Sequence, residues 1–265
     1  MRNPYEPKNI KVVEVKKLSP DAKLFRLKTK MTFVPGQFVL AGIWGYGEAP
    51  FGPASSPYEK KYIDIIVRNT GGVVTSAMHN LKKGNEITLR GPYGNGFPIK
   101  LLKNKDIIMA TGGCGIPPIA SLVQYLIKNR KNFGNIHLLY GAQTPDYLLL
   151  KNEMKKWGKD INIELTIDKP TPKWKGCTGF VTDLVSKIKV VPKKTVVIMC
   201  GPEPMTNAMK KVLEPIGISN DNIFLNIERK MQCGIGKCQH CTVGDKYACI
   251  DGPVFSFKDL ENSWD

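Results

Sequence analysis

No stretch of this 265-residue chain approaches the roughly 18 consecutive apolar residues of a membrane-spanning helix. The first residues, Met1 to Pro7, also lack the apolar core of a secretory signal peptide. No internal repeat or low-complexity tract interrupts the sequence. With a hydrophobic content of 42%, these absences indicate a globular, soluble protein, which we expect to be cytoplasmic.

Acidic residues are comparatively few, because 23 Asp and Glu stand against 39 Lys and Arg, which gives a formal net charge of +16. The basic residues are spread along the chain and form no dense tract interleaved with aromatic residues. We therefore expect no nucleic-acid partner. Dispersed lysines usually form a solvated surface, although such a surface can also attract an acidic electron-transfer protein.

Histidine is scarce, and the three histidines (His79, His137 and His240) lie in different segments, so they indicate neither a metal site nor an acid-base pair. Cysteine is better represented, with seven residues. Of these, Cys177 has no paired motif and is interpreted as structural. We interpret Cys114, in a glycine-rich turn, as a packing residue or as a neighbour of a nicotinamide.

Four cysteines near the C-terminus have the spacing C-x4-C-x2-C-x7-C, which is the plant-type arrangement for a 2Fe-2S cluster. They are Cys233, Cys238, Cys241 and Cys249. Gly234 and Gly236 suit a loop whose backbone must approach inorganic sulfide closely. A zinc site is an alternative, but zinc ligands usually come in two short pairs. A disulfide framework is typical of short secreted chains.

The first part of the chain contains short alternating segments that predict strands. These segments are Val12 to Val15, Lys23 to Lys28, Gln37 to Ile43, Tyr62 to Arg68 and Glu86 to Arg90. Turn-rich stretches such as 45–47, 71–72 and 91–96 separate them. The pattern favours a small antiparallel β-barrel over residues 1–100, with a short helix after Thr75.

From about Leu101 apolar strands alternate with helical segments. The predicted strands are Ile107 to Ala110, Ile136 to Tyr140, Ile161 to Ile167, Val196 to Cys200 and Ile223 to Asn226. The predicted helices are Ile116 to Lys128, Tyr147 to Trp157 and Glu203 to Leu213. This rhythm predicts an α/β domain with a parallel sheet over residues 101–225, followed by a small cluster-binding lobe over 226–265.

A glycine-rich turn between the first of these strands and its helix could bind a phosphate group. Gly112, Gly113 and Gly115 allow a close backbone approach, and the amides at the helix N-terminus offer donors to a pyrophosphate. However, Pro118 stands where the usual third glycine would be, and no acidic residue ends the second strand at Tyr140 to Gln143. A tight strand-to-helix turn without a ligand is therefore an alternative.

A second turn, Cys200-Gly201-Pro202, ends a later strand. Because ligands of open parallel sheets lie beyond the carboxyl ends of the strands, both turns could border one crevice. Taken alone, Cys200 would more often be an inert buried thiol.

Together these motifs resemble the ferredoxin-NADP reductase family, whose members join a flavin-binding barrel to a nicotinamide domain marked by G-x-G-x-x-P and C-G-P. The segments at Gly113 to Pro118 and at Cys200 to Pro202 match both motifs. The terminal cysteine motif resembles the branch that contains hydrogenase or sulfhydrogenase gamma subunits, the electron-transfer subunit of anaerobic sulfite reductase and, more distantly, that of dihydroorotate dehydrogenase.

The resemblance implies FAD, with contacts from two segments of the barrel. The segment that matches the family's Arg-x-Tyr-Ser motif is taken as Gly52 to Ser55, which has neither the arginine nor the aromatic residue. The implied flavin-binding residues are Pro53, Ala54, Ser55, Ser56, Ile66, Val67, Arg68, Gly72, Val73, Val74 and Thr75. Arg68 is the candidate to replace the missing cation.

The sequence thus predicts an oxidoreductase subunit that moves electrons between NAD(P)H, FAD and a 2Fe-2S cluster, with Cys200 as its catalytic residue. The resemblance implies a catalytic partner subunit of hydrogenase or sulfite reductase type, or a ferredoxin. The alternative is a non-catalytic flavin and iron-sulfur module of the dihydroorotate dehydrogenase type that uses no nicotinamide. Sequence alone leaves open the terminal substrate, the choice of NADH or NADPH and the direction of electron flow.

Overall fold

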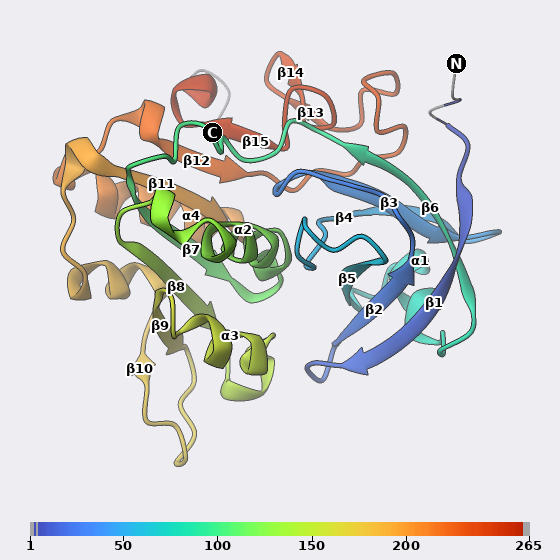
Figure 1. Ribbon diagram of the computed structural model, residues 1–265, viewed down its shortest axis with the longest axis horizontal. Helices are drawn as coiled ribbons and strands as arrows, with labels where there is room; N and C mark the ends of the chain where they lie inside the picture. The colour runs from blue at the N-terminus through green and yellow to red at the C-terminus, as the bar shows by residue number, and fades with distance from the viewer. Residues whose placement is uncertain (1–2, 4, 262–265) are drawn as a thin grey trace.

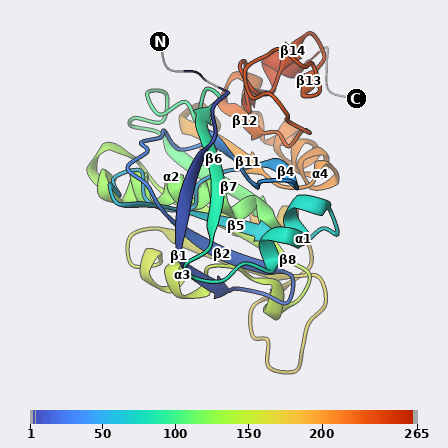
Figure 2. The same cartoon turned by 90° about the vertical axis from the view of Figure 1, so that its right-hand side faces the viewer.

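The computed structural model describes residue 3 and residues 5–261, and it consists of a β-barrel, an α/β domain and a C-terminal segment that contacts both (Figure 1). Figure 2 shows the hairpin of the C-terminal segment at the top, beside the barrel strand β6. Among the described residues, no helix is long and apolar enough to cross a membrane.

The barrel is a six-stranded antiparallel sheet in the order β4-β3-β6-β1-β2-β5. Its strands are β1 (Lys8–Lys17), β2 (Ala22–Lys28), β3 (Phe38–Ile43), β4 (Gly47–Phe51), β5 (Tyr62–Arg68) and β6 (Glu86–Tyr93). Alternate side chains such as Phe25, Leu27 and Ile63 fill the interior without solvent exposure. The short helix α1 (Val73–His79) packs against β3, β4 and β5. The predicted antiparallel barrel is therefore confirmed.

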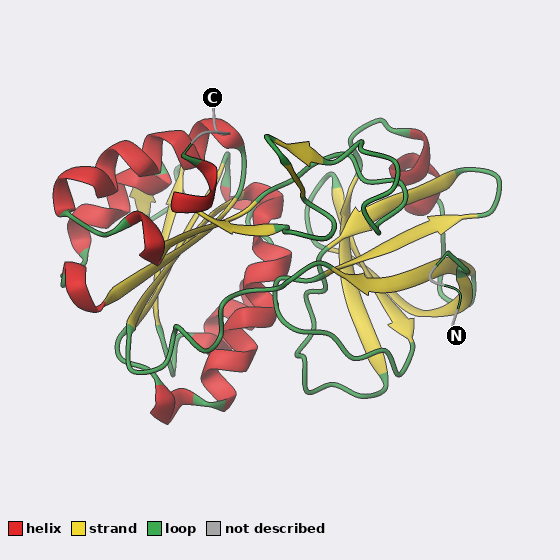
Figure 3. Ribbon diagram, turned by 90° about the horizontal axis from the view of Figure 1, so that it is seen from above, coloured by secondary structure: helices red, strands yellow, loops and turns green. Residues whose placement is uncertain are grey.

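The α/β domain contains a seven-stranded sheet in the order β10-β9-β8-β7-β11-β12-β15. Its strands are β7 (Asp106–Gly112), β8 (Ile136–Ala142), β9 (Asn162–Ile167), β10 (Cys177–Thr178), β11 (Thr195–Cys200), β12 (Ile223–Asn226) and β15 (Val254–Ser256). All neighbours pair in parallel except β12 and β15. Helices cover both faces of the sheet (Figure 3).

Two of the main helices of this domain, α2 (Ile116–Lys128) and α4 (Glu203–Leu213), have the bounds that the sequence predicts. The third, α3 (Lys151–Trp157), begins four residues later than predicted. Leu150 at its N-cap has a left-handed backbone with φ of 55°, which separates the helix from a preceding 3-10 turn at Pro145–Tyr147.

The C-terminal segment returns to the α/β sheet after forming the small hairpin of β13 (Thr242–Val243) and β14 (Lys246–Tyr247). Strand β15 then pairs antiparallel with β12, and Val243, Cys241 and Cys249 join the same apolar cluster as Met199 of the sheet. The segment from residue 226 therefore shares its core with the α/β domain.

Candidate functional site

The four predicted cluster ligands lie in one loop and pair two by two. A side-chain hydrogen bond links Cys233 with Cys238, and another links Cys241 with Cys249. Cys241 and Cys249 are buried, whereas the first pair is partly exposed. The loop therefore offers one thiol pair on its outer side and one against the apolar core.

Backbone amides of this loop point at the sulfur atoms. The amides of Lys237 and Cys238 donate to Sγ of Cys233 over 3.2 and 3.4 Å, and the amide of Gly236 donates to Sγ of Cys249 over 3.1 Å. Gly234 and Gly236 have left-handed backbones, with φ of 76° and 73°, that turn these amides inward. Amide donors of this kind stabilise thiolates.

The electrostatic effect differs between the two pairs. The amide of His240, followed by the contact with Cys233, lowers the pKa of Cys238 to about 7. Burial, followed by the hydrogen bond with Cys241, raises the pKa of the Cys249 thiol to about 12. The outer pair therefore ionises more readily, and metal binding must release a proton from the inner pair.

This geometry fits a 2Fe-2S cluster, because each iron of such a cluster takes two thiolates. Within the described residues, no three His, Cys, Asp or Glu side chains surround a single ion, which disfavours the zinc alternative. The residues that fit the cluster are thus Cys233, Cys238, Cys241 and Cys249.

A cavity of about 550 Å³ lies between the barrel and the α/β domain. Phe51, Gly52 and Ile66 line it from the barrel, and Pro118 and Cys200 line it from the α/β domain. At the seam, a Cβ on Gly52 would stand 3.1 Å from Cβ of Pro118, so the two domains touch there. The size and the mainly apolar lining suit a flavin ring.

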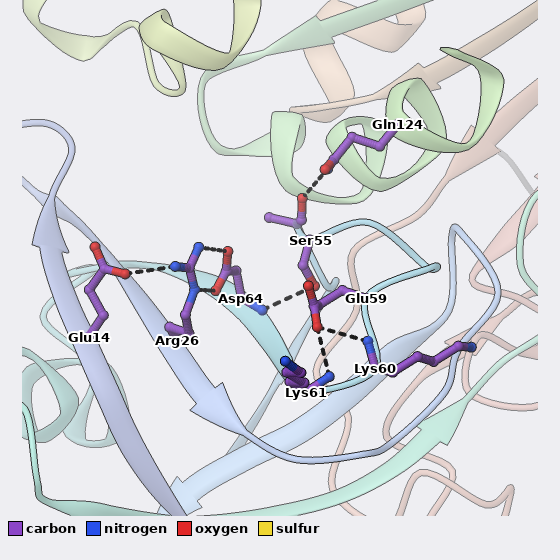
Figure 4. Close-up of polar contacts among 9 residues, drawn as sticks. Glu14, Arg26, Ser55, Glu59, Lys60, Lys61, Asp64 and Gln124 are labelled. Atoms are coloured by element: carbon purple, nitrogen blue, oxygen red, sulfur yellow. Dashed lines mark hydrogen bonds and ion pairs between the residues drawn. The ribbon is translucent and has the colours of Figure 1, made fainter. Parts of the chain in front are cut away.

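The segment that was matched to the flavin motif does not line this cavity. Pro53, Ala54 and Ser55 are buried, Ser55 Oγ accepts a hydrogen bond from the amide of Asp64 over 3.1 Å, and Ala54, Ser55 and Ser56 face a separate cleft of about 190 Å³ (Figure 4). The cleft also holds Arg26, which is paired with Asp64 over 2.8 Å.

The aromatic residue that the motif seemed to lack is Phe51, at the end of β4. The sequence analysis treated residues 45–47 as a turn between strands and did not anticipate β4, which displaced the match by a few residues along the chain. The signal was the stretch 47–51 between two glycine turns, ending in an aromatic residue.

The second predicted flavin segment divides between cavity and core. Ile66 lines the cavity, whereas Val67 points into the barrel core, as strand alternation requires. Gly72 is the N-cap of α1, and Thr75 lines the cavity and donates from Oγ1 to the carbonyl of Gly72 over 3.2 Å. Val73 is largely exposed and Val74 packs on the barrel core.

A second cavity of about 530 Å³ lies at the carboxyl ends of β7, β8, β9 and β11. Gly112, Gly113 and Pro202 line it, and so do Asp168 and Thr182. The sequence analysis did not single out Asp168, whose signal was an acidic residue directly after the third strand of the sheet. This position at the strand ends is where dinucleotides bind in open α/β sheets.

The two predicted nucleotide turns form one unit. Gly115 is buried against the carbonyl of Cys200, and a Cβ on Gly201 would stand 3.2 Å from the amide of Gly112. Burial raises the pKa of Cys200 well above its ordinary value and that of Cys114 to about 12, so both thiols are neutral. Cys114 lines both cavities.

Arg68 also lines both cavities, with its side chain 53% exposed. Its Nε pairs with Asp21 Oδ2 over 2.7 Å. The cavities therefore meet at Arg68 and Cys114, where a nicotinamide and a flavin could approach each other.

The histidines have other environments. His79 Nε2 contacts the carbonyl of Val67 over 2.8 Å and joins α1 to β5, while His240 Nδ1 contacts the carbonyl of Cys238 over 3.0 Å. Burial lowers the pKa of His137 on β8. Cys177 Sγ accepts a hydrogen bond from Lys187 Nζ over 2.8 Å, away from the cluster loop.

Three family models match consecutive parts of the chain. Residues 9–97 match an oxidoreductase FAD-binding domain, residues 109–211 match an oxidoreductase NAD-binding domain, and residues 228–261 match the iron-sulfur cluster binding domain of dihydroorotate dehydrogenase B. The cofactors of the chain are accordingly FAD, a nicotinamide nucleotide and a 2Fe-2S cluster.

Known proteins resemble the chain over nearly its whole length. Sulfhydrogenase 1 subunit gamma of Pyrococcus furiosus is 38% identical over 97% of this chain and 93% of its own length. A probable dihydroorotate dehydrogenase B (NAD(+)) electron transfer subunit of Thermococcus kodakarensis is 34% identical over 95% of this chain and 97% of its own.

A solved structure of the NADH-dependent reduced ferredoxin-NADP oxidoreductase superposes with a TM-score of 0.78 at 25% identity, over 94% of this chain and 88% of that one. The domain order, the cavities and the cysteine loop agree with these matches. The chain belongs to the family of iron-sulfur flavoproteins that includes the sulfhydrogenase gamma subunits and the electron-transfer subunits of dihydroorotate dehydrogenase B.

Proposed function

We propose that the chain is the electron-transfer subunit of a cytoplasmic hetero-oligomeric redox enzyme, and that it exchanges electrons between NAD(P)H and a catalytic partner subunit of hydrogenase or sulfite reductase type. The curated relatives are named as gamma or electron-transfer subunits. The observation that carries the proposal is the meeting of the two cavities at Arg68 and Cys114, beside a segment that runs from the flavin cavity directly into the cluster loop.

The proposed division of work follows the domains: residues 1–100 bind FAD, 101–225 bind the nicotinamide nucleotide and 226–265 hold the cluster through Cys233, Cys238, Cys241 and Cys249. When bound, FAD exchanges a two-electron hydride with a nicotinamide and single electrons with a 2Fe-2S cluster. The protein binds these groups, orients them and keeps water from the seam between them.

The nicotinamide nucleotide would lie across the carboxyl ends of the parallel strands. The amides at the start of α2 and the turn at Gly113 and Gly115 offer donors to its pyrophosphate. Cys200, Gly201 and Pro202 would support the nicotinamide ring at the seam. Because Cys200 is a neutral buried thiol, its role would be to position the ring, without a change in its own charge.

The flavin would lie in the 550 Å³ cavity with its ring near Phe51, Gly52 and Ile66. Phosphate charge would be met by Arg68 and by the amides at Gly72 to Thr75. Asp21 holds the Arg68 side chain on the nicotinamide side, so a single guanidinium could serve both cofactors.

The cavity lining also indicates a preference for NADH over NADPH. Asp168 follows β9 and lines the nucleotide cavity, where its carboxylate could accept hydrogen bonds from ribose hydroxyls. A 2′-phosphate at the same place would meet a like charge.

The cluster loop would be the exit toward the partner. Lys230 and Arg229 line the flavin cavity, Met231 follows them, and Cys233 begins the loop two residues later. Lys237 and Lys246 flank the cluster loop and could attract an acidic docking face, on a catalytic subunit or on a ferredoxin.

Anaerobic addition of NADH or NADPH to the isolated, reconstituted chain tests the proposal. We expect the flavin absorption to bleach and the cluster absorption to follow. A flavin and cluster that both stay oxidised would favour the alternative, a module that uses no nicotinamide. Native mass measurement after gentle purification should detect an associated catalytic subunit.

A further inference from the structure

Arg90 of β6 links the flavin barrel to the first cluster ligand. Its side chain is only 7% exposed, and its Nη1 donates to the carbonyl of Cys233 over 2.6 Å while its Nη2 donates to the carbonyl of Gln232 over 2.5 Å. On its other side, Nε pairs with Oε2 of Glu48 over 2.8 Å. A buried guanidinium on β6 therefore holds the backbone at the start of the cluster loop.

Asn95, just after the same strand, holds the chain beyond the last ligand. Its Nδ2 donates to the carbonyls of Asp251 and Val254 over 2.8 and 2.7 Å, and its Oδ1 accepts from the amide of Val254 over 3.2 Å. Its backbone amide donates to the carbonyl of Gly252 over 2.6 Å. Residues 90–95 thus contact the chain on both sides of the ligand loop 233–249.

The surfaces between these two points are in close contact. A Cβ on Gly234 would stand 3.0 Å from Cδ1 of Leu40 and 3.1 Å from Cδ2 of Tyr93. A Cβ on Gly94 would stand 2.5 Å from Cδ of Pro253. The loop therefore lies directly on the barrel and cannot shift toward it.

We propose that residues 90–95 form a clamp that fixes the cluster loop on the flavin barrel, and that Arg90 is the positioning residue that both orients Cys233 and tunes the cluster. The inference rests on the proposed function, in which Cys233 is a cluster ligand. Bonds from an outer residue to the backbone of a metal ligand fix that ligand and change the properties of the metal centre.

The charges of the pair Arg90 and Glu48 make the tuning measurable. The guanidinium bonds the ligand backbone itself, whereas the carboxylate lies behind it, and Glu48 Oε1 is buried without a hydrogen-bond partner among the described residues. Removal of the cation leaves a buried anion near the cluster, which disfavours the extra negative charge of the reduced state. Removal of the anion has the opposite effect.

The test uses the full chain, purified anaerobically and loaded with FAD and cluster. In Arg90→Met we expect a lower cluster reduction potential in a redox titration, altered electron paramagnetic resonance g-values and a roughly 10- to 100-fold slower reduction of the cluster by NADH. Reduction of the flavin by NADH should keep its normal rate. In Glu48→Gln we expect a higher cluster potential, and Arg90→Lys should keep the potential near that of the unmodified chain.

Arg130→Met is the matched control, because Arg130 also donates to backbone carbonyls, those of Phe133, Gly134 and Asp160, but in the α/β domain. It should leave the potential and the g-values unchanged. If Arg90→Met does not fold, Glu48→Gln and Arg90→Lys decide. Potentials that are unchanged, or that shift in the same direction for Arg90→Met and Glu48→Gln, would overturn the proposal. The iron and sulfide content of the unmodified chain tests the cluster assignment separately.

Discussion

Gly115 and Cys200 touch through their backbones, so that a Cβ placed on Gly115 would overlap the carbonyl oxygen of Cys200. The contact joins the turn after β7 to the turn after β11, two strands that pair in parallel with Thr111 opposite Cys200. Both turns border the seam between the cavities, which means that a disturbance of one displaces the other.

We therefore expect Gly115→Ala to impair nicotinamide use more than flavin or cluster binding. Overpacking costs about 1 to 3 kcal/mol, and if it is relieved by displacing the turns, affinity for NADH falls about tenfold or more. Titration of flavin bleaching with NADH measures this. Gly158→Ala is the control, because a Cβ there meets only the carbonyl of Met154 at 3.4 Å. Equal NADH affinity in both variants would contradict the coupling of the turns.

Replacement of Cys238 by serine should remove the visible absorption of the cluster and leave the flavin reducible by NADH. Cys238 lies in the ligand loop, whereas the two cavities are lined by other residues. Iron and labile sulfide analysis should give about two of each for the unmodified chain and a clear loss for the variant. Loss of NADH-dependent flavin bleaching in a folded variant would show that the sites depend on each other.

The sequence carried the fold where the signals were local. The buried strands of the parallel sheet read as apolar runs, and α2 and α4 have the predicted bounds because Pro117 and Pro204 fit the first turn of a helix. Strand β4 escaped because it contains Pro50 and no β-branched residue. A proline is tolerated there because β4 is an edge strand of the sheet.

Signals that connect distant residues were not readable in this way. Arg90 contacts carbonyls 142 and 143 positions further along the chain, and β15 has only three residues that gain their role by pairing with β12. The cysteine spacing, in contrast, named the ligand loop directly, because the chemistry of a cluster fixes the intervals. The flavin contacts lay between these cases, since Arg68 was found and Phe51 was missed.

Arg68→Ala should weaken both cofactors, because the side chain lines both cavities. A charge-assisted contact is worth about 1.5 to 3 kcal/mol, so retention of FAD should fall about tenfold or more. Equilibrium dialysis of FAD and the apparent KM for NADH measure the two effects. Arg26→Ala serves as a control, because Arg26 faces the separate cleft with Asp64. FAD retention that is unchanged in Arg68→Ala would show that other groups meet the phosphate charge.

Asp168→Ser should shift the nucleotide preference toward NADPH. Asp168 is exposed to the nucleotide cavity, and its carboxylate would repel a 2′-phosphate while it accepts hydrogen bonds from the ribose of NADH. Removal of the charge should therefore lower kcat/KM for NADH and raise it for NADPH, with a change in their ratio of about tenfold. Asp160→Ser, at an exposed acidic residue outside both cavities, should leave the ratio unchanged. A parallel loss with both nucleotides in Asp168→Ser would instead assign the residue a purely structural role in the turn after β9.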